Sequence, residues 1–277
     1  MTNLIRLVFT AVISVSICLP AGADTVNLVG ASTAVDLVFA PDRVAVERVT
    51  GHSLRVVDRG SRSLLDLSEN RADAAIISEP LELAVAAAET AGIKVAVFNL
   101  RVHELRTEEI VFVVNAGNPV GKLSVVQLAD IHTGKISNWK QVGGKDLGIT
   151  LIADASAEGT NAIVKQVVMG GAGYASGAKS VNLASGMNEL IAADESAIVA
   201  VGKGLLRLDR RLKVIETSRL ERPLAIVTWG EPQPKVVDVI NGFRAEGSRW
   251  LRRTAHLRPP AVSAPRETVF SAASTNP

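Results

Sequence analysis

The sequence predicts an α/β fold, and three patterns in its 277 residues support this prediction. Short apolar runs rich in β-branched residues recur along the chain, and TVNLVG at residues 25–30 is the first of them. Segments in which apolar residues recur at helical spacing separate these runs. Small polar turns connect the two kinds of segment. Strands that alternate with helices in this way are typical of α/β proteins.

Nine apolar runs, each four to seven residues long, are the predicted strands. This is the usual length of a strand in a globular protein. They lie at residues 25–30, 54–57, 72–78, 94–98, 109–115, 149–154, 197–201, 212–216 and 223–229. The chain contains no internal repeat, and nothing therefore points to a repeat architecture.

Two predicted helices have recognisable ends. Ser124 and Gln127 form a capping-box pattern at the start of VVQLADI, and Gly134 lies where a helix C-cap is expected. Residues 81–92 are rich in alanine and end on a glycine, which predicts a second helix.

A further helix is predicted to start at Pro234, because proline is favoured at the first helical position. Apolar residues repeat behind it at helical spacing: Val236, Val237, Ile240 and Phe243. We expect Gly247 to end this helix. Residues 259–277 are rich in Pro, Ser, Ala and Thr without periodicity, which predicts a disordered tail.

The N-terminal segment has the features of a secretory signal. One basic residue, Arg6, precedes an apolar run over residues 7–18, and the small residues 21–23 follow. We expect a signal peptide over residues 1–23, cleavage before Asp24 and export to the periplasm. The apolar run is about a dozen residues long, shorter than the roughly 20 that a membrane-spanning helix needs. An uncleaved N-terminal anchor is the alternative.

Cys18 is the only cysteine and raises a second alternative, lipidation at the cleavage point. It follows Ile17 rather than the small residue expected before a lipidated cysteine. Cleavage after Ala23 would leave a chain without cysteine, which excludes a disulfide, a thiol nucleophile and a thiolate metal site.

Charge and motifs argue against several classes of function. One of the 30 Lys and Arg is Arg6, so 29 remain against 28 Asp and Glu, which offers no electrostatic support for a nucleic-acid partner. AVGKGLL around Lys203 lacks the earlier glycine and the following Ser or Thr of a P-loop, and no G-x-S-x-G or H-E-x-x-H occurs. The four histidines are scattered. We therefore expect no catalytic residue, no metal site and no cofactor.

Three polar turns follow predicted strands and precede helical segments: residues 30–33, 60–63 and 156–160. Turns of this kind expose backbone N–H groups and hydroxyls at helix N-termini, where an oxyanion is favoured. Each turn alone is also explained by helix capping, for which Ser and Thr are ordinary residues.

The order of motifs in the second half of the chain resembles the phosphate-type solute-binding proteins of ABC transporters. In that family a strand ending in Val-Asn is followed by Asn-Pro and by Leu-x-x-Ile-x-x-Gly-Lys-Ile-x-x-Trp. Here these motifs are Val114-Asn115, Asn118-Pro119 and residues 128–139. The family's Gly-Ser-Gly-Thr anion loop is similar to residues 157–160.

The first half of the chain resembles the same family. LVGASTAVDL at residues 28–37 is similar to its first binding turn, and RADAAIISEPL at residues 71–81 to its Ala-Asp-Ile-Gly-x-Ser stretch. RPLAIVTWG at residues 222–230 resembles its return strand. The resemblance covers residues 24–253, nearly all of the mature chain.

The resemblance implies a two-lobed, periplasmic-binding-protein-like (type II) α/β fold, with two crossover strands and a ligand in the cleft between lobes that close by a hinge. We expect one lobe at residues 24–110 and 217–258 and the other at residues 111–216. The matching ligand-binding positions are Ser32, Thr33, Ser61, Ser78, Gly159 and Thr160.

Three acidic residues depart from the family pattern. Asp154 stands where the family has an arginine ahead of the anion loop, Glu158 replaces the serine of the loop, and Glu79 follows Ser78 where arginine is frequent. Two unit charges about 4 Å apart interact by roughly 4 kcal/mol at an effective dielectric constant near 20, so these carboxylates would repel phosphate. Arg62, in the second turn, can compensate for one of them. In the alternative, the acids point to solvent.

Two functions remain open on the sequence alone. The first is a monomeric periplasmic receptor that binds a small solute, phosphate or another oxyanion, for an ABC transporter permease or a membrane sensor. The second is an envelope interaction or sensor protein that keeps the fold without binding an anion. An enzyme that uses Asp154 and Glu158 ranks third, because acid–base catalysis needs one carboxylate with a raised pKa and a positioned substrate.

Overall fold

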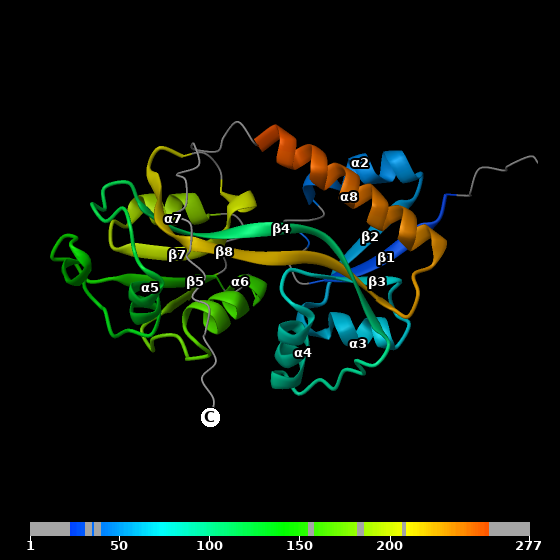
Figure 1. The fold of residues 1–277 in the computed structure, drawn as a ribbon, viewed down its shortest axis with the longest axis horizontal. Helices are drawn as coiled ribbons and strands as arrows, with labels where there is room; N and C mark the ends of the chain where they lie inside the picture. Colours follow the sequence, from blue (N-terminus) through cyan, green and yellow to red (C-terminus); the bar gives the residue numbers. More distant parts are fainter. Residues whose placement is uncertain are drawn as a thin grey trace, which may run out of the picture.

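A computed structural model describes residues 23–30, 35, 40–154, 158–181, 186–206 and 209–254. These residues form two α/β lobes that share one mixed sheet of eight strands, in the order β2-β1-β3-β8-β4-β7-β5-β6. The long strands β4 (Leu100–Asn115) and β8 (Leu212–Trp229) run side by side from one lobe to the other (Figure 1). The predicted two-lobed fold with two crossover strands is confirmed.

The first lobe is built on three parallel strands. β1 (Thr25–Gly30) lies between β2 (Ser53–Asp58) and β3 (Ala74–Ile77). The helical segments of this lobe are α2 (Ala40–Thr50), η2 (Gly60–Arg62), α3 (Ser63–Ser68), α4 (Leu81–Thr90) and α8 (Pro234–Thr254).

Helices cover both faces of this sheet because successive side chains of a strand point to opposite faces. The cluster on the side of α2 and α8 contains Leu28, Ile76, Val46 and Phe243. The cluster on the side of α3 and α4 contains Val29, Ile77, Leu64 and Ala84. Figure 1 shows the two helix pairs on opposite sides of β1 and β3. A fully buried Val, Leu, Ile or Phe side chain stabilises the fold by about 1.5–3 kcal/mol.

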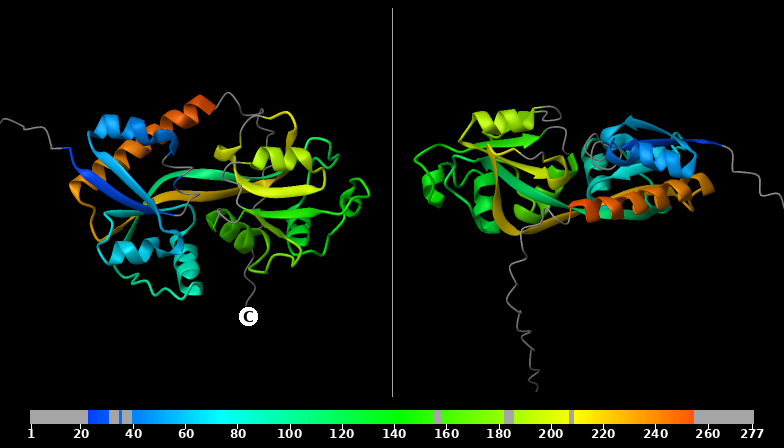
Figure 2. Two further views of the ribbon diagram at one scale, coloured as in Figure 1. Left: turned by 180° about the vertical axis from the view of Figure 1, so that it is seen from behind. Right: turned by 90° about the horizontal axis from the view of Figure 1, so that it is seen from above.

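The second lobe repeats the arrangement with β5 (Thr150–Asp154) between β6 (Lys179–Val181) and β7 (Ala197–Gly202), all parallel. Its helical segments are α5 (Val125–His132), η3 (Trp139–Val142), α6 (Glu158–Ile163), the π-helical η4 (Val164–Val168), α7 (Met187–Ala193) and η5 (Lys203–Leu205). Figure 2 shows the two lobes from behind and from above, with β4 and β8 running from one lobe to the other.

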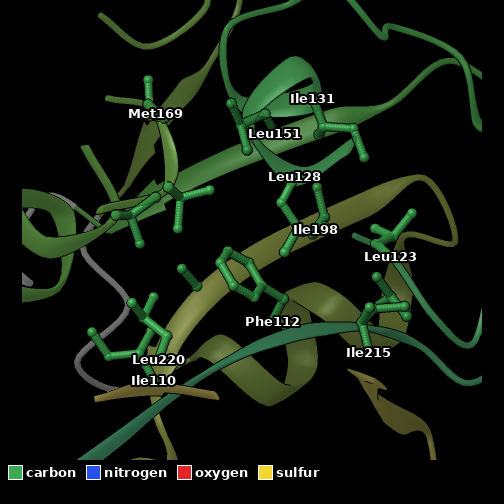
Figure 3. Close-up of a cluster of buried hydrophobic side chains, with 14 of the residues drawn as sticks. Ile110, Phe112, Leu123, Leu128, Ile131, Leu151, Met169, Ile198, Ile215 and Leu220 are labelled. Atoms are coloured by element: carbon green, nitrogen blue, oxygen red, sulfur yellow. The ribbon is translucent and has the colours of Figure 1, made fainter. Parts of the chain in front are cut away.

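Phe112 lies at the centre of the larger core of the second lobe. It comes from β4 and is surrounded by Leu128 and Ile131 of α5 and by Leu151 and Ile198 of the neighbouring strands (Figure 3). Trp139 belongs to the same core and is 1% exposed. Its indole Nε1–H donates a hydrogen bond of 2.9 Å to the carbonyl oxygen of Ser196, so the buried polar atom has a partner.

The crossover ladder contains two irregularities. β4 and β8 pair in antiparallel fashion, and the register shifts between Glu104 and Arg106 and again between Ile110 and Phe112. Irregularities of this kind bend a strand and increase its local twist. Residues 106–110 lie between them, where the chain passes from one lobe to the other.

Most of the predicted strands are present, and two predictions need correction. The runs at residues 212–216 and 223–229 form one continuous strand, β8. The run at residues 94–98 is not a strand, and its Phe98 is 81% exposed. Both edges of β3 are already occupied, by β1 and by β8, so this run has no free edge there to pair with.

The helix signals are confirmed with one exception. The Ser124 hydroxyl accepts a hydrogen bond from the Gln127 N–H, the Gln127 side chain accepts one from the Ser124 N–H, and Gly134 has a φ of 82°. α8 starts at Pro234, but Gly247 does not end it, since the helix continues to Thr254. A glycine inside a helix costs only about 1 kcal/mol, which longer flanking segments overcome.

Candidate functional site

The predicted binding positions of the first lobe follow the carboxyl ends of its parallel strands. Ser61 and Arg62 lie in η2, shortly after β2, and Ser78 directly follows β3. Ser32 and Thr33 follow β1 in the sequence and lie outside the described residues. In open α/β sheets, ligands bind at this edge.

The second lobe brings its predicted positions to the same kind of edge. α6 follows β5 and contains Gly159 and Thr160 in its first turn. Asp154 is the last residue of β5 and Glu158 the first of α6, and their side chains lie outside the described part of the structure.

Ser78 of the first lobe and Gly159 of the second lie in close contact. A Cβ atom at Gly159 would collide with Ser78 Oγ and Glu79 Oε2 and would lie 3.0 Å from the Ser78 carbonyl oxygen. Ser78 is completely buried and Thr160 is 1% exposed. Glycine at position 159 therefore permits a close approach of the lobes that a larger residue would prevent.

Glu79 shares this contact. Its Oε2 accepts hydrogen bonds from the Ser78 N–H and from the Ser78 hydroxyl, both at 3.1 Å. These two groups are the donors that Ser78 would offer to an anion. An anion that binds at Ser78 must therefore compete with the Glu79 carboxylate.

Ser61 lies next to this contact, whereas Arg62 does not line it. Ser61, Glu79, Leu83 and Ala162 of α6 are among the residues that line a cavity of about 30 Å³ between the lobes. Arg62 is not part of that lining, and its side chain is exposed. The structure thus brings Ser61, Ser78 and Gly159 together and leaves Arg62 at the surface.

A buried ion pair on the crossover strands lies beside Thr160. Arg222 of β8 is 0% exposed. Its Nη2 and Nε donate hydrogen bonds of 2.7 and 3.0 Å to Glu108 Oε2, and its Nη1 donates one of 2.8 Å to Thr160 Oγ1. The other carboxylate oxygen, Glu108 Oε1, accepts a hydrogen bond of 3.0 Å from the Gly204 N–H.

The sequence did not identify Glu108 and Arg222 as site residues. A signal was present, because each is a charged residue directly before a predicted strand, at residues 109–115 and 223–229. Nothing local indicates that these two residues, 114 positions apart, would pair.

The described ranges contain neither a metal-binding cluster nor a helix that could span a membrane. No group of three His, Cys, Asp or Glu side chains within them is placed to hold a metal ion. None of the helices in those ranges has both the length and the apolar character needed to cross a membrane.

The family to which the chain belongs follows from a comparison of its sequence with known protein families. The model of the PBP superfamily domain matches residues 20–229, which is more than half of the chain. The chain belongs to the PBP superfamily. Its resemblance to phosphate-type periplasmic binding proteins is confirmed by the relatives that follow.

Solved structures of phosphate transport proteins share the fold of this PBP superfamily member. A putative phosphate ABC transporter substrate-binding protein with bound phosphate, from Clostridium perfringens, has a TM-score of 0.67 and 19% identity, over 83% of this chain and 97% of that one. An ABC-type phosphate transport receptor from Vibrio cholerae has a TM-score of 0.65 and 22% identity, over 83% and 98%. These likenesses confirm the type II periplasmic-binding-protein fold.

One curated relative is similar in sequence. The phosphate-binding protein PstS of Bacillus subtilis (strain 168) is 37% identical to this PBP superfamily member over 75 residues. The matched segment is 27% of this chain and spans only 25% of the relative's length.

Proposed function

We propose that this PBP superfamily member is a periplasmic solute-binding protein of the phosphate ABC transporter type, which binds phosphate or a related oxyanion between its lobes. One observation carries the proposal. Ser78 of the first lobe closely approaches Gly159 of the second, and Ser61 lines the neighbouring cavity with Ala162 of α6, at the carboxyl ends of parallel strands. Hydroxyl and backbone N–H groups are the donors that an oxyanion requires.

The similar proteins support phosphate as the ligand class. The Clostridium perfringens structure carries bound phosphate in the same fold, and the Bacillus subtilis relative is a phosphate-binding protein. The second function considered above, an envelope protein that keeps the fold without an anion, is not favoured, because the relative and the two structures described above are phosphate-binding or phosphate transport proteins.

The proposal includes a location and partners. The chain would be exported by a signal peptide at residues 1–23, act as a monomer in the periplasm and deliver its ligand to an ABC transporter permease or a membrane sensor, without a nucleic-acid partner. Its lobes would comprise residues 24–110 with 217–258 and residues 111–216, followed by a disordered tail at 259–277. It would bind and release the ligand unchanged, without catalysis and without a cofactor.

Ligand-induced stabilisation of the purified chain tests the proposal. Thermal unfolding would be followed with phosphate, sulfate, molybdate, amino acids and polyamines, and the dissociation constant of each stabilising ligand measured by calorimetry. A ligand at 100 times its dissociation constant stabilises the folded state by about 2.7 kcal/mol. We expect phosphate or another oxyanion to produce such a shift. A chain that none of these ligands stabilises would contradict the proposal.

A pair of threonine variants separates binding in the cleft from binding elsewhere. Thr160→Val removes the buried hydroxyl at the lobe interface, and we expect it to weaken oxyanion binding by about tenfold, the loss of one hydrogen bond to a charged group. Thr90→Val removes an exposed hydroxyl at the end of α4 and serves as the matched control. Equal affinities in the two variants would place the ligand outside this cleft.

A further inference from the structure

Arg222 is a buried cation within the proposed anion site, although the sequence suggested Arg62 for that role. It is one of the largest fully buried side chains of the described residues, and a charged side chain is almost never fully buried unless it is paired. Neither arginine lines the cavity of about 30 Å³, but Arg62 is exposed, whereas Arg222 is bonded to Thr160 of the second lobe. Two other arginines of the first lobe, Arg59 and Arg71, are paired with Asp66.

Residues of the second lobe set the position of the Arg222 guanidinium. Its Nη1 donates to the Thr160 hydroxyl in the first turn of α6. Its Nη2 lies against Gly202, the last residue of β7, where a Cβ atom would come within 2.7 Å of it. β5 and β7 are parallel, so the guanidinium lies at their shared carboxyl edge, the edge at which ligands bind in such sheets.

The chemistry of the guanidinium suits an anion. Glu108 accepts hydrogen bonds from Nε and Nη2, which fixes the plane of the group. Nη1 and Nη2 each carry a second hydrogen beyond those in the bonds described, and guanidinium N–H groups are suited to the oxygens of a phosphate. Glu108 is in turn held by the Gly204 N–H, so it acts as a positioning residue.

We infer that Arg222, delivered by the crossover strand β8, supplies the positive charge that holds the bound oxyanion, with Glu108 positioning it. The inference rests on the proposed function. It also gives the crossover strands a part in binding, because a ligand on Arg222 and Thr160 would contact both the hinge and the second lobe.

Phosphate affinity of the purified chain and three variants tests this inference. We expect Arg222→Lys, which keeps the charge but loses the planar donor pair, to bind phosphate roughly 30-fold more weakly, as expected for about 2 kcal/mol of lost charge-assisted hydrogen bonding. The double variant Glu108→Gln/Arg222→Gln leaves no lone buried charge and should fold without binding phosphate. Arg219→Gln, an exposed arginine of the same strand, is the matched control and should keep its affinity.

A measurement on the unaltered chain covers the case in which a variant does not fold. In NMR spectra, the side-chain Nε–H resonance of Arg222 should shift on titration with inorganic phosphate. The midpoint of this shift should agree with the dissociation constant measured by calorimetry. Three results would each overturn the role of Arg222 and leave the proposed function intact. Phosphate binding could survive in both Arg222 variants, it could be lost in Arg62→Gln, or it could leave this resonance unmoved. An unaltered chain that binds no oxyanion overturns both.

Discussion

Glu108 and Arg222 face each other across the two crossover strands, midway between the two irregularities of the β4–β8 ladder. Their Cα atoms are register partners, and the guanidinium donates two hydrogen bonds to one carboxylate oxygen. The side chains are 7% and 0% exposed. Burial of a charge is costly unless an opposite charge compensates for it, so each side chain depends on the other.

Removal of the Glu108 charge should destabilise the fold. In Glu108→Gln the Arg222 charge remains buried without its counter-ion, and we expect the free energy of unfolding to fall by about 3–5 kcal/mol. Urea unfolding followed by circular dichroism measures this loss. Glu216→Gln is the control, because Glu216 pairs with Lys122 at the surface, where the two side chains are 70% and 73% exposed. Loss of such a surface pair lowers the free energy of unfolding by at most about 1 kcal/mol. Equal losses in the two variants would contradict the dependence on pairing.

A methyl group at Gly159 should hold the lobes apart. In Gly159→Ala the new Cβ atom would collide with Ser78, whose backbone carbonyl cannot rotate away. We expect oxyanion binding about tenfold or more weaker and a larger radius of gyration in small-angle X-ray scattering. Gly173→Ala is the matched control, because a Cβ atom there meets nothing within 4 Å. An unchanged radius and affinity in Gly159→Ala would show that the lobes do not need this contact.

Neutralisation of Glu79 should strengthen oxyanion binding. Its carboxylate accepts both hydrogen bonds of Ser78 and repels an incoming anion. In Glu79→Gln the repulsion disappears, and we expect the dissociation constant for phosphate to fall by about tenfold, or ~1.4 kcal/mol. Calorimetry measures the change, with Glu82→Gln, at an exposed position on α4, as the comparison. Weaker binding in Glu79→Gln would mean that the carboxylate organises the site rather than competing with the ligand.

Element ends could be predicted from the sequence where they depend on residues within one helical turn. The capping box of Ser124 and Gln127 and the start of α8 at Pro234 are of this kind. The strand predicted at residues 94–98 failed because a strand needs a neighbouring edge, and the edges near it were taken by segments distant in the sequence.

In the candidate site, too, features that depend on the local sequence could be predicted, and those that depend on distant residues could not. The placement of Ser78, Gly159 and Thr160 could be predicted, since a polar turn after a strand of an α/β sheet lies at the carboxyl edge whatever the details of packing. The pairing of Arg222 with Glu108 could not, because it depends on the register of two strands far apart in the chain. The ligand-binding roles of all the site residues that the sequence indicated stay predictions: Ser32, Thr33, Ser61, Arg62, Ser78, Asp154, Glu158, Gly159 and Thr160.

His132, the last residue of α5, is buried in the core of the second lobe. It is 1% exposed, its ring lies edge-on to Phe112 at 5.4 Å, and its Nδ1 lies 2.7 Å from the Leu128 carbonyl oxygen, to which it donates. Burial lowers the pKa of His132 to about 4, although the hydrogen bond to Leu128 opposes the shift. The ordinary value is about 6.5.

Acid should therefore weaken the fold through His132. Between pH 6.5 and 4 the unfolded chain takes up a proton at this position and the folded chain does not, so stability is retained above pH 6.5 and lost as the pH falls toward 4. We expect His132 to contribute a loss of about 2 kcal/mol between pH 7.5 and 5, measured by urea unfolding at the two pH values. His132→Phe should abolish most of this difference even if it lowers stability at both values, whereas His103→Gln, which alters a less buried histidine, should keep most of it. The same difference in His132→Phe as in the unaltered chain would assign the acid sensitivity to other groups.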